Sequence, residues 1–545
     1  MDTANAIPDL SLGDILTPEE PFGPPDADRL FARSSETAFE LIDRTNVVFA
    51  RAAMNRPVYL VGRKGAGKTA FLKGTFHDGD IAFEELVSGS VYSKYLGFVR
   101  RFQERHAPLF ADQLAEVWST LFAHVAIFHV CKTASTSDPV DELQTLWDYH
   151  QGATIANRDA TNVVEHLLAS MKELSDEMAA GADISELTAS LVSDGVSFAQ
   201  ARSALRVISQ ARGRRVVIIM DNLEDLHSRL YDVGPALQGL FRCVGRSIDE
   251  QADFDLQLCL PSEPFDDIQA MSASPEKDFR RVLPIYWSSR ELLHLVSSRL
   301  GKHLEAHYPD RLDEVRARAR RFGKDEAALL RAVLPAQMTN GLGITEDPVA
   351  YLLRHTQLLP RHAIELLNAV FCEQAGGSQP WAVQDAAIIA GTRTAERAIV
   401  AGILNAYSGN YPELRKGISA LANRLPIRFG VNKLRTVFNQ AGIRKATGQE
   451  FLEFVQMLFT VGVVGVFTGE TSRYYEAQFQ YTFASPLTAA EGTDDLCLHP
   501  LFTRHLLAQS LARMRDRTKV TYPYGTDPGQ DYRIDLGYLA AKGQR

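Results

Sequence analysis

Short apolar runs alternate with long amphipathic stretches in the first half of the chain. The runs at 57–61 and 216–220 are short enough for buried strands, and strand-like runs follow at 255–263 and 282–287. From about 83 to 210, apolar residues recur at helical spacing instead. Strands that alternate with helices are typical of a parallel sheet, so this half is predicted to be an α/β core with a long helical insertion.

The second half of the chain has a different pattern. Residues 289–371 show helical periodicity throughout. Helical runs at 432–439 and 450–459 then precede strand-like runs at 463–467 and 474–483, which a turn-rich segment joins. Two helices followed by a β-hairpin predict a winged-helix module behind a helical lid.

Chain length and terminal composition set the expected domain limits. The 545 residues are too many for one hydrophobic core. The first 25 residues are acidic and proline-rich and lack the regions of an export signal, so we expect a mobile segment. The expected parts are a flexible N-terminal tail (1–34), the α/β core (35–288, with its insertion at about 83–210), a helical lid domain (289–395), a winged-helix domain (396–510) and a C-terminal tail (511–545).

The segment between the first strand and the next helix carries the clearest chemistry. It follows the pattern G-x-x-x-x-G-K-[ST]. Its glycines let backbone N–H groups converge on phosphate oxygens, while the following helix points its positive end at them. The lysine reaches the β and γ phosphates, and the threonine hydroxyl binds Mg²⁺. We predict a P-loop that holds ATP, or alternatively GTP, through Gly62, Arg63, Lys64, Gly65, Ala66, Gly67, Lys68 and Thr69.

Carboxylates follow the second apolar run. Asp221 ends it, where a carboxylate can orient Mg²⁺ together with Thr69, although it could instead cap a helix. Glu224 and Asp225 come three and four residues later. This Asp-x-Leu-acid-acid arrangement resembles the signal-transduction NTPases with numerous domains (STAND) of the NACHT type. The resemblance implies that Glu224, or secondarily Asp225, orients the attacking water; an ordinary solvated turn is the alternative.

Further segments extend the resemblance to AAA+ and STAND ATPases, including the origin-recognition initiators. Residues 279–300 resemble the end of their ATPase core, which implies that Arg280 or Arg281 reaches the γ-phosphate of a neighbouring subunit. Two surface arginines are the alternative. The segment around Arg361 is similar to the lid motif in which an arginine contacts the nucleotide, and Ser262 lies where these families have a polar sensor.

One departure from the AAA+ pattern affects the expected rate. Asn222 stands where many AAA+ enzymes have their catalytic glutamate. Either Glu224 takes that role or hydrolysis is slow, and slow hydrolysis would suit a switch better than a motor.

The predicted winged helix has a weak electrostatic footprint for DNA. Its candidate recognition helix, 449–460, contains Glu450 and Glu453 and no lysine or arginine. A role in packing or protein contact is therefore expected, although DNA-backbone contact stays open. The basic and aromatic residues around the helix are Lys433, Arg435, Arg444, Lys445, Arg473, Tyr474 and Tyr475.

Composition and charge limit the ligands and the cellular compartment expected for this chain. The formal net charge of −9 argues against a chain that coats nucleic acid non-specifically. No apolar run approaches the ~18 residues of a membrane span, so no membrane contact is expected. The five cysteines are scattered and odd in number, which favours neither a zinc site nor a disulfide framework and fits a cytoplasmic protein.

These features together predict an ATP-dependent regulatory switch. ATP and Mg²⁺ are the expected ligands, and slow ATP hydrolysis is the expected activity. A homo-oligomer and a separate effector protein are the expected partners, since the layout resembles little-characterised bacterial P-loop ATPases, some of them linked to phage defence. The alternatives are a DNA-binding AAA+ ATPase like the origin initiators, and a module that holds nucleotide without turnover.

Overall fold

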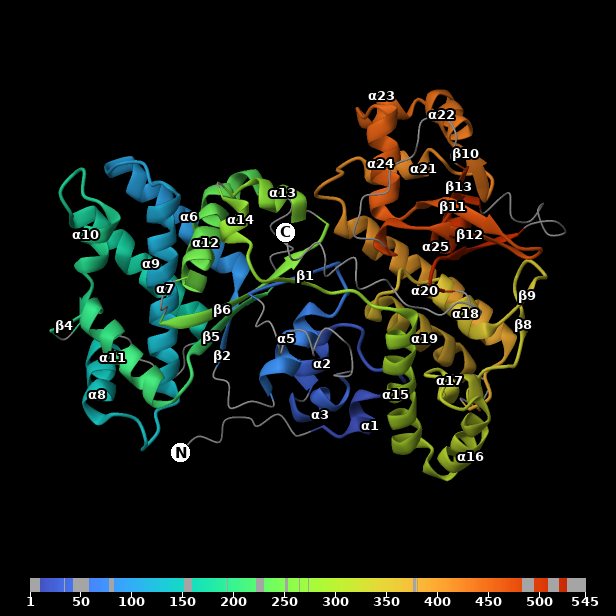
Figure 1. Cartoon of the computed structure of the whole chain (residues 1–545), viewed down its shortest axis with the longest axis horizontal. Helices are drawn as coiled ribbons and strands as arrows, with labels where there is room; N and C mark the ends of the chain where they lie inside the picture. The colour runs from blue at the N-terminus through green and yellow to red at the C-terminus, as the bar shows by residue number, and fades with distance from the viewer. Residues whose placement is uncertain are drawn as a thin grey trace. The chain divides into compact units, whose positions relative to one another are not determined.

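The computed structural model describes residues 10–33, 35–42, 58–77, 83–150, 159–193, 195–221, 230–249, 253–263, 265–272, 274–375, 379, 381–482, 495–507 and 519–526. The chain divides into two compact units (Figure 1). Unit 1 comprises Met1–Asn46, Lys64–Ala70 and Tyr286–Arg545, and unit 2 comprises Val47–Arg63 and Phe71–Ile285.

A five-stranded parallel sheet forms the centre of unit 2, in the order β2-β5-β6-β1-β7. All six residues of β5 and all four of β1 are buried, as expected for central strands covered on both faces. This confirms the predicted α/β fold class. The strands are β1 (Tyr59–Gly62), β2 (Phe83–Val87), β5 (Val216–Asp221), β6 (Phe254–Pro261) and β7 (Val282–Pro284).

Helices of the insertion pack on this sheet and on one another. Helix α7 contacts β2, β5 and β6 (Figure 1). The indole N–H of its Trp118 donates to the carbonyl of Ala236 on α12 over 2.9 Å. The other elements of unit 2 are α5 (Lys68–His77, which begins in unit 1), α6 (Ser88–Arg105), α7 (Ala111–Lys132), α8 (Val140–His150), α9 (Ala160–Glu177), α10 (Ile184–Ala189), β3 (Val192–Ser193), β4 (Val196–Ser197), α11 (Phe198–Ala211), α12 (Leu230–Asp249), α13 (Phe265–Ala270) and α14 (Pro275–Asp278).

Two sequence expectations about unit 2 need correction. Strand β2 lies inside the stretch that was expected to be helical, so the insertion begins after Val87. Its sequence, with Glu84 and Glu85, does not look like a buried strand because β2 is an edge strand of the sheet. Helix α7 is also long and apolar enough to cross a membrane, contrary to the expectation, but 89% of its apolar window is buried inside the protein.

A continuous hydrophobic core of unit 1 runs from the lid helices through the winged helix. The predicted boundary at residue 395 falls within helix α20, which packs along α19. The lid elements are α15 (Ser289–His307), α16 (Pro309–Ala319), η3 (Arg320–Phe322), α17 (Ala328–Val333), β8 (Met338–Thr339), β9 (Thr345–Glu346), α18 (Pro348–Arg354), α19 (Pro360–Ala375) and α20 (Asp385–Ala406).

The predicted winged helix is present, and its helices and hairpin lie where the pattern placed them. Its sheet has five strands, in the order β10-β13-β11-β12-β14. The elements are α21 (Leu414–Ser419), β10 (Arg428–Gly430), α22 (Val431–Gln440), α23 (Ile443–Thr447), α24 (Phe451–Val461), β11 (Val464–Glu470), β12 (Tyr474–Gln478), η4 (Gln480–Thr482), β13 (Asp495–Leu498), α25 (Pro500–Leu507) and β14 (Val520–Pro523).

The prediction of a flexible N-terminal tail does not hold for residues 10–33. They include α1 (Leu12–Ile15) and α2 (Ala27–Arg33), and α3 (Ser35–Glu40) follows. Phe22 is fully buried, its amide donates to Asn368 Oδ1 on α19, and its carbonyl accepts from Arg299 on α15. The lid therefore satisfies the backbone of a segment whose own composition suggested mobility.

The predicted C-terminal tail also contains an ordered element. Strand β14 pairs in parallel with β12, and its Tyr522 hydroxyl donates to Glu346 Oε2 of the lid over 2.6 Å. Ser289, at the start of α15, donates to the carbonyl of Gly525. Residues 519–526 thus link the wing sheet to the lid within unit 1.

Candidate nucleotide-binding site

The P-loop residues of unit 1 adopt the backbone that their sequence requires. Gly65 has φ +87° and Gly67 has φ +85°, conformations that L side chains rarely adopt. Helix α5 begins at Lys68, so the helix N-terminus directly follows the loop. Lys68 is buried, at 5% exposure, where helix α5 begins. A helix N-terminus favours anions, so this position suits a residue that binds an anionic ligand.

Two residues from the second half of the chain hold this loop. The amide of Arg361, at the start of α19, approaches the Gly65 carbonyl at 3.4 Å, and a Cβ on Gly65 would lie only 2.9 Å from Arg361 Cβ. The indole N–H of Trp287 donates to the Ala66 carbonyl over 2.8 Å. Arg361 was expected to contact nucleotide, and the structure brings it against the loop.

The guanidinium of Arg361 already has an anionic partner. Its Nη2 lies 2.9 Å from Asp26 Oδ2, at the start of α2. Glu365, one turn further along α19, has its pKa raised by burial, although the charge of Arg361 opposes that rise. Arg361 is thus the centre of a small charged group beside the loop, and its guanidinium is paired with the Asp26 carboxylate.

In unit 2, the predicted residues meet at one edge of the sheet. Because the strands are parallel, the carboxyl ends of β1, β6 and β5 lie together, and they carry Gly62, Ser262 and Asp221. The Ser262 amide donates to the Gly62 carbonyl over 3.2 Å. Asp221 is 4% exposed at the end of β5. This edge offers one carboxylate and one hydroxyl where β1 leads into the P-loop.

The chemistry of this edge suits Mg²⁺. Mg²⁺ is usually held by one or two carboxylates together with waters and substrate phosphates, not by a closed protein cage. Asp221, at the end of β5, is a carboxylate of this kind, and the other predicted ligand, Thr69, belongs to unit 1. In the part of the chain that the structure describes, no cluster of three or more His, Cys, Asp or Glu residues offers a separate metal site.

The two candidate bases cannot be located. Glu224 and Asp225, together with Asn222, lie outside the described residues. Their assignment stays a prediction from sequence.

Arg280 and Arg281 lie at the other end of the sheet. The register pairs Val282 of β7 with Tyr59 of β1, so both arginines precede the amino end of β1, whereas the P-loop leaves from its carboxyl end. A four-residue strand spans about 13 Å. Neither side chain can therefore serve a nucleotide bound at the end of its own β1 strand.

The backbone of Arg281 is unusual for a non-glycine residue. It has φ +58°, and its carbonyl accepts from the amides of both Val58 and Tyr59. Its side chain is exposed, while that of Arg280 is half-buried. A left-handed backbone costs about 1–2 kcal/mol for a residue with a Cβ, and such strain is concentrated at functional sites.

Sequence reasoning missed Trp287 and Asp26. Trp287 was included in a strand-like run, yet it follows a strand whose carboxyl end lies beside that of β1. Its position directly after that strand could therefore have identified Trp287 as a neighbour of the P-loop. Asp26 had no comparable signal, because its partner is 335 positions away in the sequence.

Two of the basic residues around the candidate recognition helix have partners within the winged helix, while Lys433, Lys445 and Arg473 are exposed. Arg444 pairs with Glu450 at 2.5 Å, and Arg435 lies over the Phe451 ring, 4.3 Å from its centroid. Helix α24 buries most of its residues and exposes Leu452 and Glu453. The helix expected to read DNA therefore meets solvent with apolar and acidic side chains.

Comparisons with known proteins identify no family. No family model matches the chain, and no curated protein matches it. Among solved structures it is similar to the Aeropyrum pernix ORC2 protein, solved as ADPNP-ADP complexes, with 13% identity, a TM-score of 0.26, and coverage of 87% of this chain and 93% of that one. At this identity and score the likeness supports neither a family nor a function. The element order and sheet topology of this chain establish its fold. It is a parallel-sheet P-loop NTPase core with a long helical insertion, a helical lid and a winged helix.

Proposed function

We propose that this chain binds ATP with Mg²⁺ and hydrolyses it slowly, as a switch that couples its nucleotide state to assembly with other copies or with a partner protein. The P-loop and Arg361 hold the phosphates in this proposal. Asp221 and Thr69 hold the metal, and Glu224 orients the attacking water. By resemblance, the setting is bacterial antiviral defence in the cytoplasm, with a separate effector protein.

The contact between Arg361 and Gly65 carries the proposal. A nucleotide that orders the P-loop acts directly on the first turn of α19, because that turn rests on Gly65. Helix α19 belongs to the continuous core that extends to the winged helix. Since packed cores do not deform continuously, a shift at the start of α19 is passed on as a discrete rearrangement.

An arginine supplied by a neighbouring subunit would link turnover to assembly. Arg281 is exposed, has a strained backbone and lies away from the P-loop end of its own β1 strand. Such an arginine stabilises transition-state charge only across an interface. This arrangement favours a switch by assembly, whereas the exposed apolar and acidic residues of helix α24 do not favour the DNA-binding alternative.

Titration calorimetry with ATP and Mg²⁺ tests the site. We expect Lys68→Ala to weaken ATP binding by about tenfold to a hundredfold, because charge-assisted hydrogen bonds contribute roughly 1.5–3 kcal/mol. Lys73→Ala is the matched control, since Lys73 is on the same helix and pairs with Glu85 at 3.6 Å. Equal affinities for the wild type and Lys68→Ala would overturn the assignment.

Phosphate release separates a switch that turns over from a module that only holds nucleotide. We expect slow, Mg²⁺-dependent release by the wild type and none by Glu224→Gln, with ATP binding kept in both. Release that is absent from the wild type at every protein concentration would leave only the nucleotide-holding alternative.

A further inference from the structure

A polar cavity lies inside unit 1, where the lid, helix α20, the last helix of the winged helix and strand β14 meet. Its volume is about 190 Å³. Since a water occupies about 30 Å³ of liquid, this is room for several waters or for one small organic anion. Three arginines line it, Arg354, Arg393 and Arg504, against the single carboxylate of Glu396.

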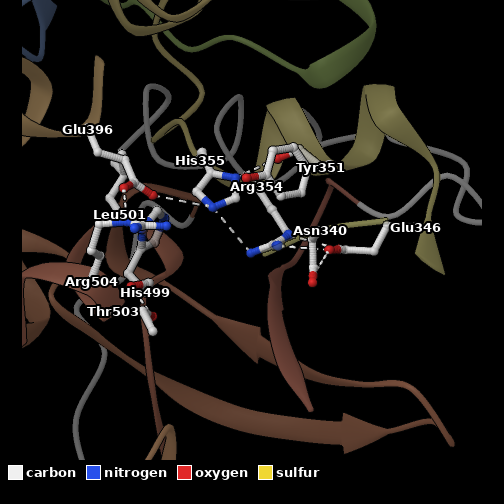
Figure 2. Close-up of polar contacts among 10 residues, drawn as sticks. All are labelled: Asn340, Glu346, Tyr351, Arg354, His355, Glu396, His499, Leu501, Thr503 and Arg504. Carbon is white, nitrogen blue, oxygen red and sulfur yellow. Dashed lines mark hydrogen bonds and ion pairs between the residues drawn. The ribbon is translucent and has the colours of Figure 1, made fainter. Parts of the chain in front are cut away.

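Arg354, at the end of α18, is held in place by its own partners. It is buried, and its guanidinium makes two 3.0 Å hydrogen bonds to the oxygens of Glu346 (Figure 2). It also lies over the rings of Tyr351 and Tyr522, at 4.8 and 5.6 Å from their centroids. Glu346 thus neutralises this arginine, which forms a fixed wall of the cavity.

His355 and Glu396 continue the chain of polar contacts. His355 Nδ1 donates to the Tyr351 carbonyl over 2.7 Å, so its Nε2 carries a lone pair when the ring is neutral. That nitrogen lies 3.4 Å from Glu396 Oε1 and 3.4 Å from Arg354 Nη1 (Figure 2). Burial keeps the pKa of His355 well below its usual value and raises the pKa of Glu396 to about 7. Arg354 is one donor to His355 Nε2, and a proton on Glu396 removes the lone-pair repulsion between its Oε1 and the same nitrogen.

Protonation of Glu396 changes the charge balance of the cavity. When Glu396 is neutral, Arg504, whose Nε lies 3.1 Å from Glu396 Oε2, loses its anionic partner. Arg393, on the rim, has no hydrogen bond or ion pair within the described part of the chain, and its guanidinium lies against Gly341. Two guanidinium groups, Arg393 and Arg504, then face the cavity without a counter-charge.

We propose that this cavity is a second anion-binding site, which takes a small molecule carrying a phosphate or carboxylate group between Arg393 and Arg504. Guanidinium forks match both groups through paired, charge-assisted hydrogen bonds. The walls come from the lid and from the winged helix, so the ligand stabilises the packing of one on the other. The site is separate from the P-loop and does not depend on the function proposed for it.

Binding of sulfate, as a probe, to the full-length Lys68→Ala protein tests the site while weakening anion binding at the P-loop. Sulfate is titrated against chloride at constant ionic strength, and the rise in unfolding temperature is recorded. We expect Arg393→Gln to weaken sulfate binding by about tenfold. Arg397→Gln is the matched control: Arg397 is exposed one turn further along α20 and does not line the cavity. Equal sulfate responses in Arg393→Gln and its parent overturn the proposal.

A parallel titration with succinate identifies the chemical class. Sulfate that binds more tightly than succinate indicates a phosphate ligand, and the reverse indicates a carboxylate. Failure of both probes to bind in the parent overturns the proposal.

The pH dependence gives a readout that a purely structural ion-pair cluster would not show. Sulfate keeps both charges between pH 6 and 8, so tighter binding at the lower pH reports protonation of the protein. We expect Glu396→Gln to remove this dependence and keep the tight binding, and a dependence that survives in Glu396→Gln excludes the mechanism. The charged and titratable groups that face Glu396 are Tyr351 and Arg354 on α18, His355 directly after α18, Arg393 on α20 and Arg504 on α25.

Discussion

Alanine substitutions at Gly65 and at Gly67 distinguish two structural requirements of the P-loop. Both positions need a positive φ, but only Gly65 must also leave room for Arg361. Both glycines have a positive φ, of +87° and +85°, so alanine at either position costs about 1–2 kcal/mol of backbone strain. At Gly67 the new Cβ would meet nothing within 4 Å, whereas at Gly65 it would lie 2.9 Å from Arg361 Cβ. Only Gly65→Ala is therefore expected to disturb the lid.

The size of the extra effect follows from that contact. Carbon atoms prefer separations of about 3.5–4.0 Å, and Cβ of Arg361 belongs to the first turn of a helix, so the helix itself must move. Overpacking of this kind costs about 1–3 kcal/mol. Since 1.4 kcal/mol is a factor of ten, the start of α19 should open roughly 5- to 150-fold more often in Gly65→Ala than in Gly67→Ala.

Hydrogen exchange followed by mass spectrometry on the nucleotide-free protein measures this opening. The amide of Arg361, which approaches the Gly65 carbonyl, and its neighbours on α19 should exchange faster in Gly65→Ala alone. Adding Arg361→Gly removes the clashing Cβ and should restore slow exchange. Equal exchange in both alanine variants would refute the contact between lid and loop, and with it the coupling proposed above.

Three further variants test other contacts. Asp26→Asn frees Arg361 for a nucleotide and should raise ATP affinity by up to about fivefold, because exposed ion pairs contribute up to about 1 kcal/mol. Calorimetry measures this affinity. Glu20→Gln is the control, because Glu20 pairs with Arg29 instead. Asp221→Asn should abolish Mg²⁺-dependent phosphate release while keeping some nucleotide binding. Changing both Arg280 and Arg281 to alanine should lower turnover and leave ATP affinity nearly intact, and mixing this variant with Lys68→Ala should restore part of the activity.

For each of these variants, one outcome would contradict the prediction. Unchanged affinity in Asp26→Asn means that the aspartate does not compete with phosphate for Arg361. Mg²⁺ dependence that survives in Asp221→Asn assigns the metal to another carboxylate. Turnover that is independent of protein concentration, with no rescue in the mixture, makes the two arginines structural and the enzyme a monomer.

Local patterns predicted the P-loop, the central strands and the winged helix, because each depends on residues close together in the sequence. Strand β2 was missed since an edge strand tolerates Glu84 and Glu85. The N-terminal segment was read as a tail because its order comes from Arg299 and Asn368, which its own composition cannot reveal. Asp26 was missed for the same reason, because its partner Arg361 is distant in the sequence. Arg361 itself was predicted because it begins a helix in a segment that resembles the lid motif.

The Gly65–Arg361 contact also has a consequence for biosynthesis. The two residues are about 300 positions apart, so the ribosome must add all of the intervening chain before the loop acquires its support. At 5–20 residues per second this takes about 15–60 s. During that time the nascent P-loop is without Arg361, and a truncated product that ends before residue 287 has the complete phosphate-binding motif without either of the contacts that hold it. Nucleotide binding should therefore mature late in translation, once the lid has been made.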